Sequence, residues 1–512
     1  MKLKSLIIVL VSLIVSAGAA AQGKPESRVE GELLVKFRPG ADRIRALRGR
    51  SAAMIEQLGD LGWVRIKLPD GLAVEDELRR FADDPQIEAA QPNFYYHLLV
   101  TPNDPRFVSN ELYGLARISA AAAWDVTTGS SSVVVANIDT GIRYTHEDLA
   151  ANMWTNPGEI PGNGVDDDGN GFADDYYGYD FRYNDPDPMD EHGHGTHTAG
   201  TIGAVGNNAL GVVGVNWNVR LMAIKIYSAA ANDTTSAQLI NAYNYVRMMK
   251  LRGVNIRATN NSYGGCTEAC GYDQATKDAI DALGDAGVLN VFAAGNNNAN
   301  NDTAANPNYP STYTSPSIVA VASSTSTDAR SSFSSYGAVS VDLAAPGSGI
   351  LSTTAGSNSS YGLSSGTSMA APHVTGAAAL LAAANPSLSA ASLKATLLNT
   401  VDPLAAWSGL VRTGGRLNAA AAIQNQTVCT FGLATNSVSV KRKGGVFSVA
   451  VAAGPNCDYA ARSSVPWIKV IGPDALSGSG TVTFRVAFSL TRSRTGSVSV
   501  AGQTITVGQS TN

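Results

Sequence analysis

The spacing of apolar positions changes twice along the 512-residue chain and predicts three folded units. Between residues 22 and 100, "GELLVKF" and "WVRIKL" alternate as strands do, whereas "VEDELRRFADD" repeats its apolar positions at helical spacing. Residues 101–426 alternate short apolar strands, such as "SSVVVANIDTG", with helical stretches such as "TSAQLINAYNYVRMMKLRG". From residue 427 onward, "GTVTFRVAF" and "TGSVSVAGQTITVGQ" alternate between Gly turns and show no helical pattern.

These patterns predict a different fold class for each unit. Residues 22–100 read as a small α+β unit. Residues 101–426 read as an α/β unit, with a mostly parallel sheet and helices on both faces. Residues 427–512 read as a small antiparallel all-β sandwich. Sites in parallel sheets lie at the carboxyl ends of strands, and Asp139, Ser262 and Asn296 all stand at or just past predicted strand ends.

The first 21 residues have the layout of a secretory signal peptide. Lys2 and Lys4 precede an apolar run from Leu6 to Val15, and small residues follow up to Ala21. The alternative is a membrane anchor, for which the run is too short. We therefore expect cleavage after Ala21, secretion, and a mature form with no membrane anchor.

Charge separates the last two units. The net charge of −5 is mild and argues against a nucleic-acid partner. Residues 99–426 carry 15 Lys and Arg against 27 Asp and Glu, a balance of −12, whereas residues 427–512 carry 8 against 2, a balance of +6. This asymmetry indicates distinct modules.

Four cysteines, in an exported chain, favour disulfides. Pairing of Cys266 with Cys270 and of Cys429 with Cys457 is the simplest of three connectivities. The CxxxC spacing could instead hold a metal, although no histidine lies near it in sequence.

Three residues from distant segments suggest nucleophilic catalysis. "VVVANIDTGI" places Asp139 at the end of an apolar strand, "DEHGHGTHTAG" places His194 at a helix start, and "GTSMAAPH" places Ser368 at another. A serine needs an imidazole to take its proton and a carboxylate to orient that imidazole. The alternatives are a zinc cluster of His192, His194 and His197, and a Ser368 that only caps its helix.

The chain resembles the subtilisin-like serine proteases. "DTGI", "HGTHTAG", "AAGN" and "GTSMAAPHVTG" occur in that order, and the resemblance covers about Asp104 to Gln424. It implies that Asp139 is the acid, His194 the general base and Ser368 the nucleophile. It also implies that Asn296 of "FAAGN" helps to stabilise the oxyanion.

The same resemblance implies the residues that bind substrate. "NNSYGG" matches the segment that pairs with the substrate backbone, so Ser262, Tyr263 and Gly264 are expected to contact residues before the scissile bond. Asn308 falls where the family has the floor of the first specificity pocket. A polar floor predicts a pocket less suited to large apolar side chains.

The resemblance, in its thermitase-like branch, also implies a strong calcium site. Its ligands come from "PNDPRF", "HEDL" and "VGNNALGVV". They are the side chains of Asp104, Asp148 and Asn208 and the carbonyl groups of Val205, Leu210 and Val212. A hard cation fits such an all-oxygen set.

A second calcium loop is visible without any family. "DDDGNGFAD" has the spacing of a DxDxNG loop, with Gly171 at its sharp turn. The expected ligands are Asp166, Asp168, Asn170, the Phe172 carbonyl and Asp174. Tyr177 replaces the usual final Glu, so Asp175 is a candidate substitute, and the alternative is a solvated acidic turn.

The outer units also resemble known modules. Residues 22–100 resemble the family's ferredoxin-like propeptide, an intramolecular inhibitor, with self-cleavage expected between Tyr96 and Thr101. An unrelated α+β domain kept in the mature enzyme is the alternative. Residues 427–512 resemble BACON-like β modules through Cys429, Cys457, "VPWIKV" and the final Gln509, which implies a carbohydrate or surface ligand. Trp467 reads as a core residue rather than a sugar platform.

Together the sequence predicts a secreted, calcium-stabilised serine endopeptidase that acts on proteins or peptides and is made as a self-processed zymogen. A calcium-binding adhesin on an inactive protease scaffold is the alternative from another class. A narrow processing protease is a third possibility that the sequence leaves open.

Overall fold

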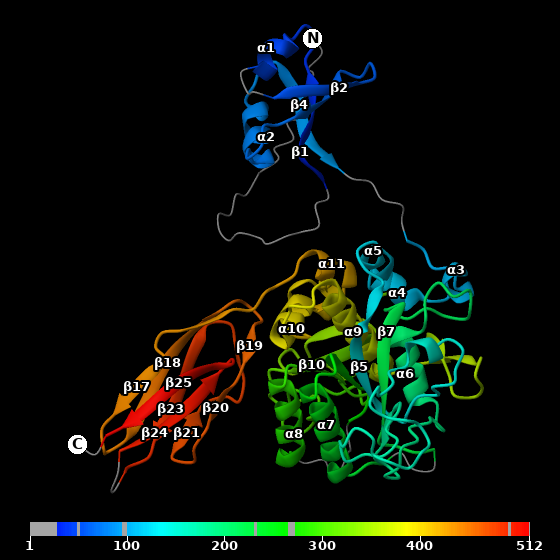
Figure 1. The fold of residues 1–512 in the computed structure, drawn as a ribbon, viewed down its shortest axis with the longest axis vertical. Helices are drawn as coiled ribbons and strands as arrows, with labels where there is room; N and C mark the ends of the chain where they lie inside the picture. Colours follow the sequence, from blue (N-terminus) through cyan, green and yellow to red (C-terminus); the bar gives the residue numbers. More distant parts are fainter. Residues whose placement is uncertain are drawn as a thin grey trace, which may run out of the picture. The chain divides into compact units, whose positions relative to one another are not determined.

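The computed structural model describes residues 28–48, 52–94, 100–229, 233–264, 272–489 and 493–510 (Figure 1). The expected signal peptide and the expected Cys266–Cys270 disulfide lie outside these residues. The chain divides into two compact units, Met1–Leu98 and Leu99–Asn512. Among the described residues, no helix has both the length and the apolar character of a membrane span.

The first unit is a four-stranded antiparallel sheet with two helices. Its elements are β1 (Arg28–Phe37), α1 (Arg43–Arg48), β2 (Ala53–Leu58), β3 (Trp63–Lys67), α2 (Val74–Ala82) and β4 (Ile87–Phe94). The strand order β2-β3-β1-β4 is that of a ferredoxin-like fold. Leu33, Val35 and Phe37 alternate along β1 into the core, where Phe81 of α2 is fully buried.

A nine-stranded sheet organises the second unit. Its order is β14-β15-β11-β10-β9-β8-β5-β7-β6, and every pair is parallel except β14 with β15. The strands are β5 (Gly129–Asp139), β6 (Gly178–Asp180), β7 (Asn218–Lys225), β8 (Ile256–Asn261), β9 (Leu289–Ala293), β10 (Ile318–Ser324), β11 (Leu343–Pro346), β14 (Asp402–Pro403) and β15 (Gly415–Arg416). β12 (Ile350–Thr353) and β13 (Tyr361–Ser364) form a separate hairpin.

Helices cover both faces of this sheet, as the sequence predicts (Figure 1). One face packs against α6 (His194–Gly203), α9 (Thr367–Ala384), α10 (Ala390–Asn399) and α11 (Ala419–Gln424), and the other against α7 (Ser236–Leu251) and α8 (Gln274–Asp285). Short helices α3 (Pro105–Val108), α4 (Tyr113–Arg117), α5 (Ala120–Trp124), η1 (Ala150–Asn152) and η2 (Ala405–Trp407) complete the elements of this domain. The central strands are apolar on both sides because both sides are buried.

The strand order reverses at β5, since β7 follows on one side of it and β8 on the other. In open parallel sheets the crevice beyond the strand ends at such a point binds ligands. β5 ends at Asp139, so the topology puts this carboxylate at the expected place.

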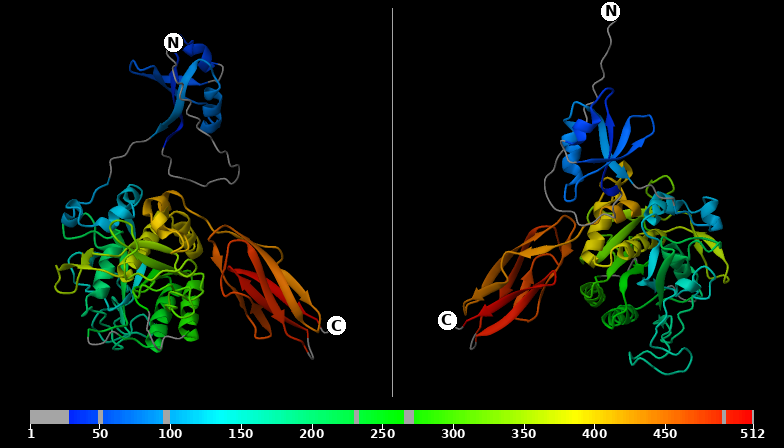
Figure 2. Two further views of the ribbon diagram at one scale, coloured as in Figure 1. Left: turned by 180° about the vertical axis from the view of Figure 1, so that it is seen from behind. Right: turned by 45° about the horizontal axis from the view of Figure 1, so that its top comes forward.

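The C-terminal domain contains strands and no helix among its described residues (Figure 2). One sheet has the order β16-β18-β23-β21, the second β17-β25-β24-β20, and β19 pairs with β22. The strands are β16 (Phe431–Leu433), β17 (Ser437–Val440), β18 (Gly445–Ala453), β19 (Asp458–Tyr459), β20 (Ala461–Ser463), β21 (Ile468–Ile471), β22 (Leu476–Ser477), β23 (Gly480–Val486), β24 (Arg494–Val500) and β25 (Gln503–Gln509).

One detail differs from the predicted antiparallel sandwich. β17 pairs parallel with β25 at the edge of its sheet. Only three residues separate the end of β16 from the start of β17, yet the two strands belong to different sheets. The short segment between β16 and β17 passes from one sheet to the other and places β17 beside β25, the last strand. The alternation of apolar and polar residues in the sequence does not indicate whether two strands pair parallel or antiparallel.

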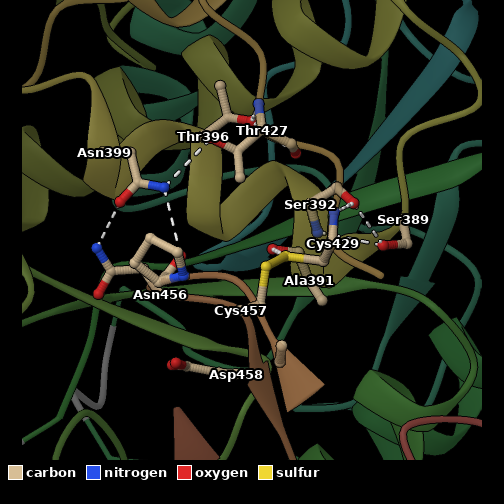
Figure 3. Close-up of a disulfide and its surroundings, with 12 residues drawn as sticks. Ser389, Ala391, Ser392, Thr396, Asn399, Thr427, Cys429, Asn456, Cys457 and Asp458 are labelled. Atoms are coloured by element: carbon tan, nitrogen blue, oxygen red, sulfur yellow. Dashed lines mark hydrogen bonds between the residues drawn. A yellow bond between two sulfur atoms is a disulfide. The ribbon is translucent and has the colours of Figure 1, made fainter. Parts of the chain in front are cut away.

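An ion-pair network joins this domain to the domain of the parallel sheet, and a disulfide within the C-terminal domain lies beside it. Cys429 and Cys457 form the expected disulfide, next to α10 (Figure 3). Asp458 is 7% exposed, and its carboxylate lies 2.8 Å from Nζ of Lys394 and 3.2 Å from two guanidinium nitrogens of Arg412. Burial alone raises the pKa of Asp458, but the charges and hydrogen bonds of both cations hold this pKa well below its usual range.

Candidate active site

Ser368 lies in the first turn of α9, where a proline frees its carbonyl group. Pro372 has no N–H, so the Ser368 carbonyl lacks the helical donor that residue 372 would otherwise supply. The Ser262 hydroxyl fills this place and donates to the Ser368 carbonyl at 2.9 Å, while the Ser368 hydroxyl donates to the Ser262 carbonyl at 3.0 Å. These two bonds tie the serine to the segment expected to bind substrate.

His194 and Asp139 are paired at the carboxyl end of β5. Nδ1 of His194 lies 2.6 Å from Oδ1 of Asp139, which also accepts from the backbone N–H of Thr140 at 2.8 Å. Asp139 is 2% exposed, and the His194 side chain is 27% exposed. Burial alone lowers the pKa of His194, but the charge and hydrogen bond of Asp139, with a contribution from Asp190, raise it above its ordinary value.

Asp190 fixes the loop that leads into α6. Its Oδ1 accepts from the backbone N–H groups of His192 and Gly193, and its Oδ2 accepts from the N–H of Thr196. The Thr140 hydroxyl also donates to Asp190, so the loop is tied to the residue after Asp139. The sequence reasoning missed this residue, although an acidic residue just before a helix start is a known capping signal.

Asn296 is oriented toward Ser368 by Thr367. The backbone N–H and the hydroxyl of Thr367 donate to Oδ1 of Asn296 at 2.8 and 2.9 Å. The amide oxygen is thereby occupied, which leaves Nδ2 as the group that Asn296 offers to a ligand. Thr367 is fully buried, and sequence reasoning missed its part.

A cavity of about 160 Å³ joins these residues. It is lined by Tyr263, Gly264, Ala293, Gly295, Asn296, Asn297, Asn308, Thr367 and Ser368. Three of the four expected substrate-binding residues are therefore on its wall. The fourth, Ser262, is buried beside it and reaches Ser368 instead.

Asn308 closes the cavity against two glycines. A Cβ at Gly295 would lie 2.8 Å from Oδ1 of Asn308, and one at Gly264 would lie 2.9 Å from the Tyr309 carbonyl. Nδ2 of Asn308 donates to the Ser311 hydroxyl at 2.9 Å. Among the described residues, nothing donates to its Oδ1.

The other histidines of the sequence motifs are not brought together as metal ligands. His192 is exposed, whereas His197 bonds the Ile350 and Gly362 carbonyls and His373 bonds the Met369 carbonyl. Burial lowers the pKa of His197 and of His373 to about 4. Within the described part of the chain, the cluster suited to a metal is made of carboxylates.

The expected strong calcium site has its residues in contact. Asn208 donates to Oδ1 of Asp148 at 2.7 Å, the Val212 N–H donates to Oδ2 of Asp148, and the Asn207 N–H donates to Asp104. Oδ1 of Asp104 is buried without a hydrogen-bond partner. Burial raises the pKa of both carboxyl groups, and the Asp148 charge raises that of Asp104 further.

These observations fit a cation at that place. A buried carboxylate oxygen without a donor is costly, and two nearby carboxylates repel each other. A calcium ion would remove both costs. Among the described residues, no donor bonds the carbonyl groups of Val205, Leu210 or Val212, so these too are available as ligands.

The second loop gathers a carboxylate set that differs from the expected one. Asp168 is joined by Glu159 and Asp175, with ligand atoms within 4.8 Å of one another. Asp166 instead accepts from the N–H groups of Asn170 and Gly171, and Asp174 accepts from those of Asn163 and Gly164.

The electrostatics of this cluster also fit a cation. Burial raises the pKa of Asp175 to about 6. The Asn156 and Asn170 amides donate to the carboxylates at 2.8–3.3 Å, and an amide that turned over would present oxygen instead. The Phe172 side chain packs against the rings of Tyr179 and Tyr245, and the ligand expected from this residue is its carbonyl group. Nothing in the spacing of "DDDGNGFAD" indicates Glu159.

Comparison with known proteins identifies the family. Residues 130–432 match the Subtilase family, Peptidase S8, and residues 15–93 match the Fervidolysin N-terminal prodomain. The chain belongs to the subtilase family. It is therefore a subtilisin-like serine endopeptidase with an N-terminal prodomain, as the sequence motifs indicate.

Individual relatives agree with this assignment. Thermitase of Thermoactinomyces vulgaris is 37% identical over 63% of this chain and 99% of its own length. The Extracellular basic protease of Dichelobacter nodosus is 31% identical over 79% of this chain and 69% of its own length. A protease structure from Pseudoalteromonas arctica aligns over 63% of this chain and 99% of its own length, with a TM-score of 0.51 and 30% identity.

Proposed function

We propose that this subtilase is a secreted, calcium-stabilised endopeptidase, made as a self-processed zymogen, with Ser368, His194 and Asp139 as its catalytic triad. The 2.6 Å contact between His194 and Asp139, beside the cavity lined by Ser368 and Asn296, is the observation that carries the proposal. Relatives named as extracellular proteases support secretion.

The proposed reaction begins when the Ser368 hydroxyl turns from the Ser262 carbonyl toward Nε2 of His194. His194 takes the proton as the oxygen attacks the substrate carbonyl, and Asp139 stabilises the imidazolium that forms. Nδ2 of Asn296 and the Ser368 N–H donate to the oxyanion, and the N-terminus of α9 adds a favourable dipole. His194 then protonates the leaving amine, and water releases the acyl group from Ser368.

An irreversible fluorophosphonate reagent tests this assignment. We expect stoichiometric labelling, located at Ser368 by peptide mass spectrometry, and loss of activity in proportion to label. Absence of label at Ser368 in folded, calcium-loaded mature protein would instead support the adhesin alternative.

We further propose that residues 22–100 form the inhibitory propeptide, residues 101–426 the catalytic domain and residues 427–512 a separate β module. The match of residues 15–93 to a prodomain family supports a propeptide in this part of the chain. Self-cleavage between Tyr96 and Thr101 would release the inhibitor.

The residue before the scissile bond is expected to be small or polar. Among the described residues no donor bonds Oδ1 of Asn308 at the cavity wall, so a Phe or Leu side chain would leave this oxygen unpaired, at a cost of roughly 1–3 kcal/mol. Matched peptides should therefore show kcat/KM at least about fivefold higher with Asn or Ser than with Phe. A strong preference for Phe or Leu would contradict this role of Asn308.

Calcium removal is expected to lower the free energy of unfolding without changing the catalytic residues. Ligand that binds only the native state stabilises it by about 4 kcal/mol at a thousandfold excess over Kd. In a Ser368→Ala background, which prevents autolysis, EGTA should lower the midpoint of urea unfolding. Asp104→Asn should reduce this shift, since it removes charge from the strong site. An equal midpoint with and without calcium would contradict the calcium proposal.

We propose that the C-terminal domain binds an anionic carbohydrate or surface. Both of its acidic side chains face the catalytic domain: Asp458 meets Lys394 and Arg412, and Asp474 lies 3.4 Å from Lys277.

Exposed cations gather at the opposite end of this domain. They are Lys441, Arg442 and Lys443, on the turn before β18, and Lys469 and Arg485, which are register partners on β21 and β23. The Gly445–Val486 pair at this end lies six residues along β18 from the Val451–Gly480 pair near Asp458, about 20 Å at the usual strand rise.

Retention on immobilised heparin measures this surface. The Ser368→Ala protein should elute at higher salt than a variant with both Lys469→Glu and Arg485→Glu, because fewer charges then contact the polyanion. Equal elution would show that these cations are only a solvated face.

A further inference from the structure

The two oxygens of Asp139 have unequal environments. Oδ1 is occupied by His194 and by the Thr140 N–H. Oδ2 has one donor among the described residues, the hydroxyl of Thr198, at 3.3 Å. Because Asp139 is 2% exposed, bulk water does little to solvate this second oxygen. Among the described residues, the Thr198 hydroxyl is therefore the one hydrogen-bond donor to Oδ2 of Asp139.

The Thr198 hydroxyl has one hydrogen and three acceptors within reach. Besides Asp139, Oδ1 of Asn137 lies at 3.2 Å and the Gly195 carbonyl at 3.0 Å. Only the carboxylate is charged, and hydrogen bonds to charged groups are about twice as strong as neutral ones.

The two neutral acceptors already have other donors. Nδ2 of Asn260 donates to Oδ1 of Asn137 at 3.0 Å, and Nδ2 of Asn137 donates to the Gly195 carbonyl at 3.0 Å. Because the carboxylate is charged and both neutral acceptors already have a donor, Asp139 is the favoured acceptor of the Thr198 hydroxyl hydrogen.

These side chains form one buried network across the site. Asn137 is on β5 with Asp139, Thr198 is on α6 with His194, and Asn260 is on β8, two residues before Ser262. Asn260 also bonds the Ser262 hydroxyl at 3.0 Å and accepts from Thr375 of α9 at 3.2 Å. Asn137, Thr198, Asn260 and Thr375 are each fully buried. The network thus connects every element that carries a proposed catalytic residue except the segment of Asn296.

We infer that Thr198 is a positioning residue for the His194–Asp139 pair, held in place by Asn137 and Asn260. Its hydroxyl donates to Oδ2 of Asp139, which fixes the plane of the carboxylate and stabilises part of its negative charge. Without this donor, more charge acts on His194 and the imidazolium is stabilised further. The inference rests on the proposed roles of His194 and Asp139.

The test compares Thr198→Val, which has nearly the same shape but no hydroxyl, with Thr198→Ser, which keeps the hydroxyl. In Thr198→Val, the acid limb of the kcat/KM–pH profile should move to higher pH by about 0.3–1 unit. The reason is that the pKa of His194 rises, so the neutral form that acts as the base appears only at higher pH. At pH values above the limb, kcat should fall several-fold with KM little changed. Thr198→Ser should restore the position of the limb.

Several outcomes separate this inference from the proposed function. An unchanged acid limb in an active, fluorophosphonate-labelled Thr198→Val enzyme would overturn the inference alone. A wild-type enzyme that does not label at Ser368 would overturn the proposed function itself. If Thr198→Val does not fold, Thr198→Ala removes the hydroxyl without adding volume, and the same shift is expected. Equal profiles for Thr198→Ala and Thr198→Ser would overturn the inference.

Discussion

Replacement of His194 by alanine is expected to lower kcat by about a millionfold, the loss measured for the equivalent change in subtilisin itself, a member of this family. Without the imidazole, the Ser368 proton has no acceptor, and Asp139 has nothing to orient. If the protein processes itself as proposed, this variant does not, so it needs a cleavage site for a specific protease placed before Thr101. Hydrolysis of a chromogenic peptide by the released mature form gives the rate.

His192→Ala is the matched control for this change. His192 is two residues away and exposed, with its ring centroid 6.3 Å from that of His194. We expect its kcat to stay within about tenfold of wild type, since it bonds none of the proposed catalytic groups. A His194→Ala enzyme with near wild-type activity would contradict the assigned base.

The largest effect on stability is expected at Asp458. Asp458→Ala would leave Lys394, 4% exposed, and Arg412 without their shared carboxylate. Removal of one partner of a buried ion pair costs about 3–5 kcal/mol, because the remaining charge is buried and unpaired. This applies to Lys394, whereas Arg412 keeps its contact with Asp342 at 3.3 Å. Urea unfolding in the Ser368→Ala background should show this loss. The contacts between the two domains should weaken with it.

Asp233→Asn is the control for this prediction. Asp233 pairs with Arg182 at 3.2 Å, but its side chain is 79% exposed, so solvent already screens the pair. Its unfolding midpoint should match that of the parent protein. If Asp458→Ala also matched the parent, the ion-pair network would not hold the two domains together.

The sequence alone leads to much of this architecture because the strongest signals are local. Strand and helix spacing predict the parallel sheet, and the short motifs around Asp139, His194 and Ser368 predict which strand ends and helix starts meet. Even the link between Ser262 and Ser368 has a local cause, since Pro372 frees the carbonyl that Ser262 bonds.

The remaining parts depend on contacts between distant segments. Thr198 and Asn137 read as ordinary helix and strand residues until folding brings them to Asp139 and Gly195. Glu159 joins Asp168 only because its loop folds back. The docking of the β module through Asp458 likewise has no signal in spacing or composition.

The most direct test of the central claim compares the purified precursor with its Ser368→Ala variant in calcium. Denaturing gels and N-terminal sequencing follow processing, and casein digestion follows activity. The account predicts that the wild-type chain loses about its first hundred residues and digests casein, whereas the variant does neither. Processing and digestion by the variant, or an inert full-length wild type across a range of pH, would contradict Ser368 as the nucleophile of a self-processing protease.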